Sequence, residues 1–190
     1  MRLLNNLFRR RRPPKSKLGG LFAMSTAYLT LAAQADLQPA GKAGLCFRPL
    51  ESGVFDRAER EVRDVVLAGA RYMNTRVEAH DDPYGFRWLV LDDPQFEDLV
   101  AAIHIAGQSM EEKGFRDQLL AAVFKFQRLD GPAYWIYNYK RGKFYPFVPA
   151  TTASQSRDHP QELRLHSSME KELPLEDELE QWYPLWGMPL

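Results

Sequence analysis

The pattern of apolar and polar residues predicts alternating helices and strands along most of the chain. Apolar residues recur every three or four positions from Phe55 to Met73, and again from Phe96 to about Lys113. This spacing is typical of helices with one buried face. Asp93 and Pro94 are expected to be the N-cap and first residue of the second helix, and Gly114 its left-handed C-terminal cap.

Shorter apolar runs predict strands. They are Thr75–Ala79, Phe86–Leu91, Leu119–Phe126, Ala133–Lys140 and Lys143–Val148. The first two flank the turn Asp82–Gly85 and the last two flank Arg141-Gly142, so each pair is expected to form a hairpin. The middle run is almost continuously apolar, as in a strand covered on both faces, and Pro146 indicates a strand at a sheet edge.

The beginning of the apolar pattern is shorter and more mixed. Leu18–Ser25 is expected to form one or two helical turns. Ala27–Ala33 and Ala43–Arg48 are expected to be strands that pair as a hairpin across a glycine-containing turn.

The end of the chain is polar and then aromatic. Thr151–Gln161 is expected to be a linker, and Gln161–Lys171 and Leu175–Gln181 are expected to be short helices. The aromatic tail Gln181–Leu190 is expected to lie as a strap on its own domain. Together these elements predict an α+β fold in which helices pack on a mainly antiparallel sheet. Residues 18–190 are expected to form a single domain, preceded by an arm of residues 1–17.

Charge is unevenly distributed and changes the interpretation of this arm. The first 35 residues hold seven Lys/Arg and no Asp or Glu, so the rest holds 18 basic and 25 acidic residues, a net charge of −7. Helical spacing would place Leu3, Leu4, Leu7 and Phe8 on one side, followed by Arg9, Arg10, Arg11 and Arg12. These eight residues are the candidate contacts with an anionic membrane surface.

Two other interpretations of the arm stay open. It could be a basic tail that binds nothing, or part of a signal peptide ending near Ala33-Gln34-Ala35, with Arg9–Arg12 similar to a twin-arginine leader. The run that follows is diluted by glycine and hydroxyl residues and is too short for a transmembrane helix. Retention in the cytoplasm, with peripheral binding at the inner face of the cell membrane, is therefore expected.

No catalytic constellation is evident in the sequence. Neither a phosphate-binding loop nor a dinucleotide fingerprint occurs, and the four histidines are scattered. His80-Asp81-Asp82 is typical of a turn, His104 is expected on the solvent side of its helix, and Cys46 is expected to be inert packing. The sequence therefore predicts no enzyme, no metal and no cofactor. An enzyme of unrecognised type remains an alternative, and it would need Cys46 exposed beside a histidine or an acid.

The last hairpin and the tail hold the candidate partner-binding residues. These are Tyr139, Lys140, Arg141, Lys143, Trp182 and Trp186. Aromatic rings beside cations can also stack on single-stranded nucleic acid, which is the alternative function. The acidic body and the ordinary frequency of aromatics in strands favour a chain that binds no nucleic acid.

Five segments of distinctive sequence carry a resemblance to a known family. They are Leu21–Ala27, Gly44–Pro49, Tyr84–Leu91, Tyr137–Phe147 and Trp182–Gly187. Together they resemble the PspA-associated protein family PspAB, in order along nearly the whole chain. The resemblance implies a cytoplasmic accessory role in cell-envelope stress, without catalytic residues. It also implies phage-shock protein A or another protein of its operon as partner, and a domain similar to secretion-chaperone-like folds.

Overall fold

An antiparallel sheet organises the chain. The computed structural model describes residues 18–70, 74–150 and 155–190, and within these ranges the chain forms a six-stranded sheet of order β2-β3-β1-β4-β5-β6. All neighbouring strands are antiparallel. The strands are β1 Gln38–Phe47, β2 Arg76–Asp81, β3 Arg87–Asp92, β4 Leu119–Arg128, β5 Gly131–Asn138 and β6 Lys143–Phe147. The predicted α+β class is confirmed.

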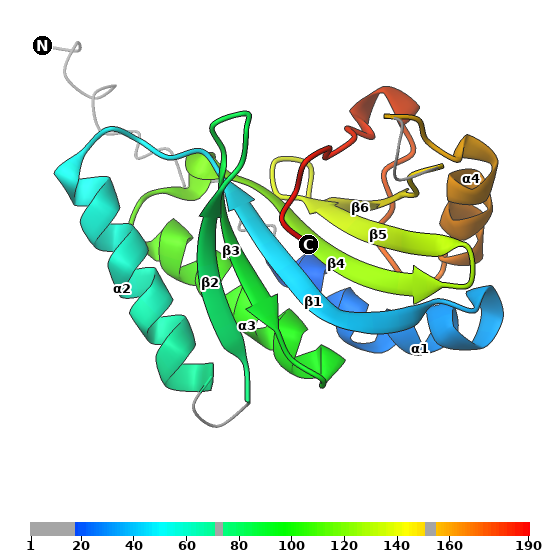
Figure 1. Ribbon diagram of the computed structural model, residues 1–190, viewed down its shortest axis with the longest axis horizontal. Coiled ribbons are helices and arrows are strands. Elements are labelled where there is room, and N and C mark those ends of the chain that lie inside the picture. Colours follow the sequence, from blue (N-terminus) through cyan, green and yellow to red (C-terminus); the bar gives the residue numbers. More distant parts are fainter. Residues whose placement is uncertain (1–17, 71–73, 151–154) are drawn as a thin grey trace, which may run out of the picture.

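Four α-helices occur among the described residues, and three of them cover one face of the sheet (Figure 1). A 3₁₀ turn, Leu18–Ala23, leads into α1, and both α1 and α3 pack on β1. Helix α2 packs on α3 and on β2, whereas α4 lies beside β6. The helices are α1 Met24–Ala35, α2 Gly53–Ala70, α3 Phe96–Glu112 and α4 His159–Ser168.

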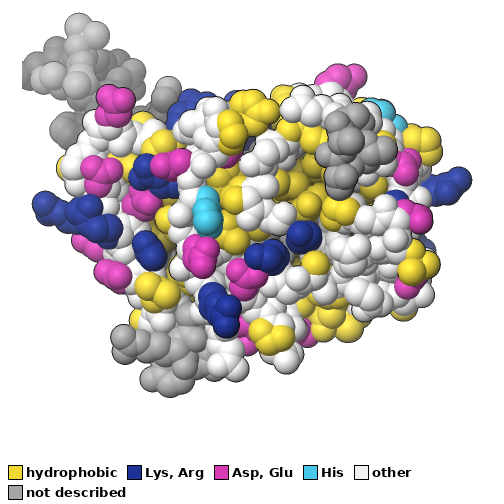
Figure 2. Space-filling model, viewed as in Figure 1, with side chains coloured by type: hydrophobic (Ala, Val, Ile, Leu, Met, Phe, Trp, Pro, Cys, Tyr) yellow, Lys and Arg dark blue, Asp and Glu magenta, His cyan; other side chains and the backbone are white. Residues whose placement is uncertain are grey.

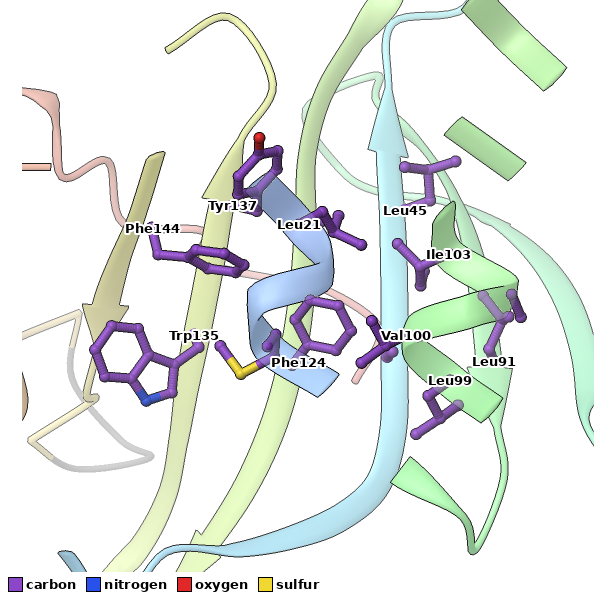
Figure 3. Packing of buried hydrophobic residues seen from close by; sticks show 14 of the residues in the cluster. Leu21, Leu45, Leu91, Leu99, Val100, Ile103, Phe124, Trp135, Tyr137 and Phe144 are labelled. Atoms are coloured by element: carbon purple, nitrogen blue, oxygen red, sulfur yellow. The ribbon is translucent and has the colours of Figure 1, made fainter. Parts of the chain in front are cut away.

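The main core lies between the sheet and these helices. Figure 3 shows Leu99 and Ile103 of α3 in one apolar layer with Leu45 of β1, Leu91 of β3 and Phe124 of β4. All five side chains are fully buried or nearly so. The three- and four-residue spacing along α3 therefore places its apolar side on the sheet, as the sequence pattern predicted.

Strand β4 contributes to both faces of the sheet. Phe124 belongs to the helix-side core, whereas its neighbour Val123 belongs to a second apolar cluster on the opposite face, and both are fully buried. Successive side chains of a strand point to opposite faces, so a strand buried on both sides has a continuously apolar sequence. The prediction of a doubly covered strand is confirmed.

Several local predictions are confirmed and one cap is wrong. The hairpins β2–β3 and β5–β6 form, β6 is the last strand of the sheet, and Gly114 has the expected positive φ of 85°. Asp93 is not the N-cap of α3, because that position belongs to Gln95. The buried Asp93 carboxylate instead accepts hydrogen bonds from the Gln95 backbone N–H at 2.8 Å and from the Thr75 hydroxyl at 2.5 Å.

The predicted strand Ala27–Ala33, and with it the first predicted hairpin, is wrong, because this segment lies within α1. The buried positions of α1 are Met24, Ala27 and Leu31, whereas Leu29 is exposed. Alternation of Leu29 and Leu31 with polar neighbours suggested a strand. The three- and four-residue spacing that continues from Leu21 was the correct period.

The predictions for residues 151–181 also need correction. Helix α4 begins at His159, inside the expected linker, because Asp158 caps it by accepting a hydrogen bond from the Gln161 backbone N–H at 3.1 Å. The predicted helix Leu175–Gln181 is absent apart from a 3₁₀ turn, Leu179–Gln181. Leu175 instead forms a parallel bridge with Phe144, which covers the free edge of β6.

Candidate functional site

The second face of the sheet is covered by the last part of the chain. We call residues 176–190 the C-terminal strap. In Figure 1 the strap, drawn in red, leaves the α4 side and ends over β1 and β4. Figure 2 shows hydrophobic side chains gathered at the centre of the same face. The strap therefore lies on the second apolar cluster, which the strands present away from the helices.

The strap begins at a clamp between Glu176 and Arg141. The Glu176 side chain is 1% exposed and accepts two hydrogen bonds, from Arg141 Nε at 2.6 Å and from Arg141 Nη2 at 2.8 Å. These bonds hold the pKa of Glu176 below its ordinary value. Arg141 Nη2 also donates to Glu178 Oε1 at 2.8 Å. A two-pronged guanidinium contact of this kind fixes direction as well as charge.

Trp182 is the central anchor of the strap. Its ring is 4% exposed and stacks on Tyr145, with the ring centroids 6.2 Å apart. Its indole N–H donates to the Glu176 carbonyl at 2.8 Å, and its own carbonyl accepts a hydrogen bond from Arg157. The Tyr145 hydroxyl then donates to the Tyr183 carbonyl at 3.0 Å. The strap is thus hydrogen-bonded to its surroundings as far as Tyr183.

Arg157 is held in turn by a buried carboxylate. Arg157 Nε lies 2.9 Å from Oε1 of Glu162, a residue of α4 that is fully buried. The same Glu162 oxygen accepts a hydrogen bond from the Val148 backbone N–H at 2.8 Å. The guanidinium also lies over the Phe147 ring, 5.4 Å from its centroid. Helix α4 therefore fixes the cation that holds Trp182 in place.

A groove of about 1260 Å³ lies between the strap and the end of the sheet where the β2–β3 loop stands. Its lining includes an apolar set from the sheet and the strap. These residues are Cys46, Phe86, Trp88, Leu120, Ala121, Tyr145, Leu185 and Trp186. Its polar lining includes Arg48, Asp82, Glu111, Arg116, Asp117, Lys140 and Arg141. The groove therefore combines an apolar interior with four basic and three acidic side chains.

The acidic residues of the groove are mostly engaged locally. Asp82 accepts hydrogen bonds from the backbone N–H groups of Tyr84 and Phe86, both at 2.9 Å, and from the Trp88 indole at 3.0 Å. The turn chemistry expected for Asp82 is therefore what the structure shows. Arg48 is exposed and makes no ion pair with any residue in the described ranges. Its charge is available at the groove although the body of the chain is acidic.

Cys46 lies in the wall of the groove as a buried neutral thiol. Burial, assisted by the charge of Asp82, raises the pKa of Cys46 to about 12. A nucleophilic cysteine needs the opposite shift and a basic neighbour. Within the described ranges, no group of three or more His, Cys, Asp or Glu side chains could hold a metal ion.

His104 is the one histidine whose predicted environment needs correction. It is not on the solvent side of α3, because its ring is partly buried against Phe22, with the ring centroids 4.2 Å apart. Burial lowers the pKa of His104. The 3₁₀ turn before α1 covers this position, and the sequence of α3 alone could not show that.

The structure separates the six candidate partner-binding residues into two groups. Tyr139, Lys140, Arg141 and Trp186 line the groove, whereas Lys143 and Trp182 do not. Tyr139 is 8% exposed. Its hydroxyl packs so closely on Gly107 of α3 that a Cβ added to this glycine would lie only 2.9 Å from it. Arg141 is held by the strap, and Lys143 pairs with Asp177 at 3.3 Å. Lys140 is exposed and Trp186 is half-buried.

The aromatic hairpin offers little surface for base stacking. Tyr137 and Phe144 face the helix-side core, and Tyr145 and Phe147 lie under the strap. All four rings are buried. The rings that suggested a nucleic-acid platform therefore stabilise the two apolar clusters.

Some candidate residues lie outside the described ranges, and some groove residues were not predicted from the sequence. The candidate membrane-surface residues Leu3, Leu4, Leu7, Phe8 and Arg9–Arg12 lie outside the described residues. Leu18, the first described residue, lines the groove. Sequence reasoning missed Arg48, Phe86 and Leu185 as groove residues, because they come from three distant segments and no local signal joins them.

Within the described ranges, no helix has the length and hydropathy needed to cross a membrane. Comparison with known proteins gives one finding. The family model described as PspA associated protein B matches residues 1–190, the whole chain. No curated protein and no solved structure matches significantly, so the expected likeness to secretion-chaperone folds stays a prediction.

Proposed function

The chain belongs to the PspA associated protein B family, and from this premise we propose that it is a non-enzymatic accessory protein of a phage-shock envelope-stress system. Its partner is phage-shock protein A or another protein of the same operon. The observation that carries the proposal is the groove beside the strap, which has the composition of a protein-binding surface. The name of the family, which refers to association with PspA, supports the same role.

Size and composition favour a polypeptide over a small molecule. Pockets for small ligands occupy roughly 300–1,000 Å³ and enclose most of their ligand. This groove is about 1260 Å³ and includes Trp186, Arg48 and Arg116 in its lining. Tryptophan, tyrosine and arginine are the residues that contribute most to protein interfaces. A segment of a partner chain is therefore the occupant that fits best.

The basic residues at the groove favour one orientation of the bound partner segment. Arg48 and the exposed Lys140 lie on a body whose net charge outside the first 35 residues is −7. A partner segment with a carboxylate beside apolar residues would place the carboxylate at Arg48 and the apolar residues inside the groove. Such pairs contribute more to orientation and to association rate than to affinity.

Binding of the purified full chain to purified phage-shock protein A by calorimetry tests the proposal. Arg48→Glu should weaken the affinity at least about ten-fold, because it places like charges opposite each other. Arg76→Glu is the matched control, since Arg76 is exposed on β2 away from the groove and the change in net charge is identical. We expect this control to bind like the unmodified chain.

Absence of binding by the unmodified chain to phage-shock protein A and to the other operon products would refute the proposed function. Equal weakening by both variants would show that only net charge matters. The groove would then not be the binding site. Turnover of a small substrate by the purified chain would refute its non-enzymatic character.

The arm supplies a second, reversible contact in this proposal, with an anionic membrane surface. Four apolar side chains contribute roughly 1.5–3 kcal/mol each when buried, and each cation near the surface contributes about 1 kcal/mol. Ordering about ten residues costs on the order of 10–20 kcal/mol, which offsets most of this gain. Binding should therefore be weak, dependent on anionic lipid and lost at high salt.

Co-sedimentation with vesicles tests the arm directly. The full chain should sediment with vesicles that contain phosphatidylglycerol at low salt and remain in solution with phosphatidylcholine alone. A chain lacking residues 1–17 should remain in solution with both. Equal sedimentation of the full chain with both vesicle types, or undiminished sedimentation without the arm, would refute the anchor.

A further inference from the structure

The two halves of the strap are attached differently. Glu176–Tyr183 is held by the Arg141 clamp, by Trp182 and by hydrogen bonds from Arg157 and Tyr145. Pro184–Leu190 makes no hydrogen bond to any other residue that the structure describes, and its one backbone bond, from Leu190 N–H to the Met188 carbonyl, is internal. This second half is therefore held on the sheet by apolar contact alone.

The apolar contacts of Pro184–Leu190 are incomplete. Leu185, Trp186, Met188 and Leu190 are only partly buried, although all four pack on the second cluster. The Trp186 ring meets Phe147 edge to face, with the centroids 4.9 Å apart. Partly buried apolar residues contribute less than fully buried ones, because the stabilisation scales with the area removed from water. The second half of the strap is thus the weakest part of the cover on this face.

The sheet offers a receptive surface below this half of the strap. Gly44 of β1 has no side chain, so Leu190 lies directly against its backbone, and a Cβ added there would be 3.3 Å from the Leu190 methyl groups and 3.1 Å from the Trp88 ring. The surrounding positions include Cys46, Val90 and Val123, which are buried. The structure thus shows, with the chain's own residues, what this surface accepts: a short irregular segment bearing Leu and Trp.

The groove continues this surface beyond the strap. Leu185 and Trp186 belong to both, because they pack on the second cluster and also line the groove. Pro184–Leu190 therefore covers only part of the continuous apolar surface. A partner segment that covered this area and also entered the groove would bury more apolar surface than the strap does.

From this arrangement we infer that the sheet surface under Pro184–Leu190 is a docking surface for an extended partner segment bearing leucine and tryptophan, and that Pro184–Leu190 occupies it as an internal competitor. The inference rests on the proposed function in one respect, that the partner is a protein of the same stress system. Binding of the partner displaces Pro184–Leu190, while Trp182 and the Arg141 clamp keep the first half of the strap in place.

The first test uses the strap itself as the probe. A fluorescein-labelled peptide with the sequence of residues 184–190 is titrated into the full chain and into a chain that ends at Tyr183. A tethered segment competes at an effective concentration of the order of millimolar, so the truncated chain should bind the peptide at least about ten-fold more tightly than the full chain. A peptide carrying Leu185→Ala and Trp186→Ala should not bind either chain.

A second variant guards against a truncation that disturbs folding. Leu185→Ala with Trp186→Ala in the full chain keeps the length of the strap and shortens two of the apolar side chains that hold Pro184–Leu190 on the second cluster. Because Leu185 and Trp186 both pack on the second cluster and line the groove, this double variant should also bind the unmodified peptide more tightly than the unmodified chain does. Failure of both the truncated chain and the double variant to bind the peptide, with their circular dichroism unchanged, would overturn the docking surface.

The partner then tests the competition. Phage-shock protein A should bind the chain that ends at Tyr183 at least about five-fold more tightly than the full chain, because the competitor is gone. Equal or weaker binding to the truncated chain would overturn the internal competitor. If phage-shock protein A and the other operon products bind neither chain while the peptide binds the truncated one, the proposed function fails and the docking surface stands.

Discussion

The two faces of the sheet are closed by different means. On one face, α1, α2 and α3 bury a continuous apolar cluster that includes Leu21, Leu99 and Phe124, all fully buried. On the other face, the strap covers a smaller cluster with one buried ring, Trp182, and several partly buried side chains. The position of the strap is fixed mainly by the ion pair of Arg141 with Glu176 and by the hydrogen bond from Arg157 to the Trp182 carbonyl. The helix face is closed by burial, and the strap face by a few directional contacts.

This difference separates stability from accessibility. Burial of a large cluster is cooperative, so the helix face should open only when the whole domain unfolds. The second half of the strap has no hydrogen bonds to the rest of the described structure and little fully buried surface. Such a segment opens at a low free-energy cost. The fold therefore provides a stable scaffold on one side and a surface that can be uncovered on the other.

The largest expected effect lies on the helix face. Phe124→Ala should lower the free energy of unfolding by about 3–5 kcal/mol, because Phe124 is fully buried and packs on Phe96, with the ring centroids 5.7 Å apart. Urea denaturation followed by circular dichroism measures this change. Leu129→Ala is the control, since Leu129 is 94% exposed and its loss should cost less than about 0.5 kcal/mol. Equal effects of the two variants would contradict the assignment of the core.

Trp182→Ala should have the next largest effect, about 3 kcal/mol, at the lower end of the range for buried aromatic residues. The substitution removes the stack on Tyr145 and the bond to the Glu176 carbonyl, while the helix-side cluster stays intact. Urea denaturation gives the magnitude, and increased binding of a hydrophobic dye before the main transition would show that the strap face opens first. A single transition without early dye binding would show that the two faces unfold together.

The observed helices and strands show how far the sequence predicts the fold. Local periodicity was sufficient for α2, α3 and the β2–β3 and β5–β6 hairpins, because each has a clear period of its own. It failed at Ala27–Ala33, because the apolar residues of this segment fit both the alternation of a strand and the three- and four-residue spacing of a helix. It also failed at Leu175–Gln181, where the contact of Leu175 with Phe144 overrides local preference.

The candidate site was predictable only in part. Lys140, Arg141 and Trp186 carried a composition signal and do line the groove. Arg48 and Phe86 reach the groove only because β1 and β3 are neighbours in the sheet. Trp182 looked like a residue available to a partner, yet Arg157, a residue from another segment, helps to hold it in a buried position. A site assembled from distant segments depends on topology, which local patterns do not specify.

Alkaline pH should lower the free energy of unfolding through Cys46, which lies in the second apolar cluster. The pKa of Cys46 is raised from 9.0 to about 12 by folding, so the folded state keeps a proton that the unfolded state loses. This contribution to stability is therefore complete below about pH 9 and is lost as the pH rises toward 12. By pH 10 the expected loss is about 1.4 kcal/mol, from about 1.4 kcal/mol per pH unit.

Urea denaturation of the unmodified chain and of Cys46→Ala is compared at pH 7 and pH 10. The comparison separates the effect of the thiol from that of the tyrosines, which also ionise at alkaline pH. The free energy of unfolding should fall less between the two pH values in Cys46→Ala than in the unmodified chain. Identical falls would mean that burial does not raise the pKa of the thiol. A chain that ends at Tyr183 should react faster with a thiol reagent at pH 8 than the full chain, since Cys46 lies in the surface that Pro184–Leu190 helps to cover.

The smallest change in global stability, and the sharpest test of the comparison, is expected for Glu176→Gln. Arg141 holds the pKa of Glu176 below its ordinary value, so the clamp stabilises the fold at neutral pH and is lost as the pH falls from the ordinary glutamate range through that lowered value. Glutamine imitates the protonated side chain at pH 7. It keeps one oxygen acceptor and turns the other position into a donor, which Arg141 cannot use.

Hydrogen exchange measured by residue shows where this change acts. Amides after Glu176 should exchange several-fold faster in Glu176→Gln, whereas amides of α3 should keep their rates, because the helix face does not depend on the clamp. Glu178→Gln is the matched control: Glu178 shares the same guanidinium but its side chain is 60% exposed, so its loss should change the strap less. Equal acceleration in α3 and in the strap would mean that the two faces open as one unit, and the strap could not then uncover the sheet while the helix-side core stays folded.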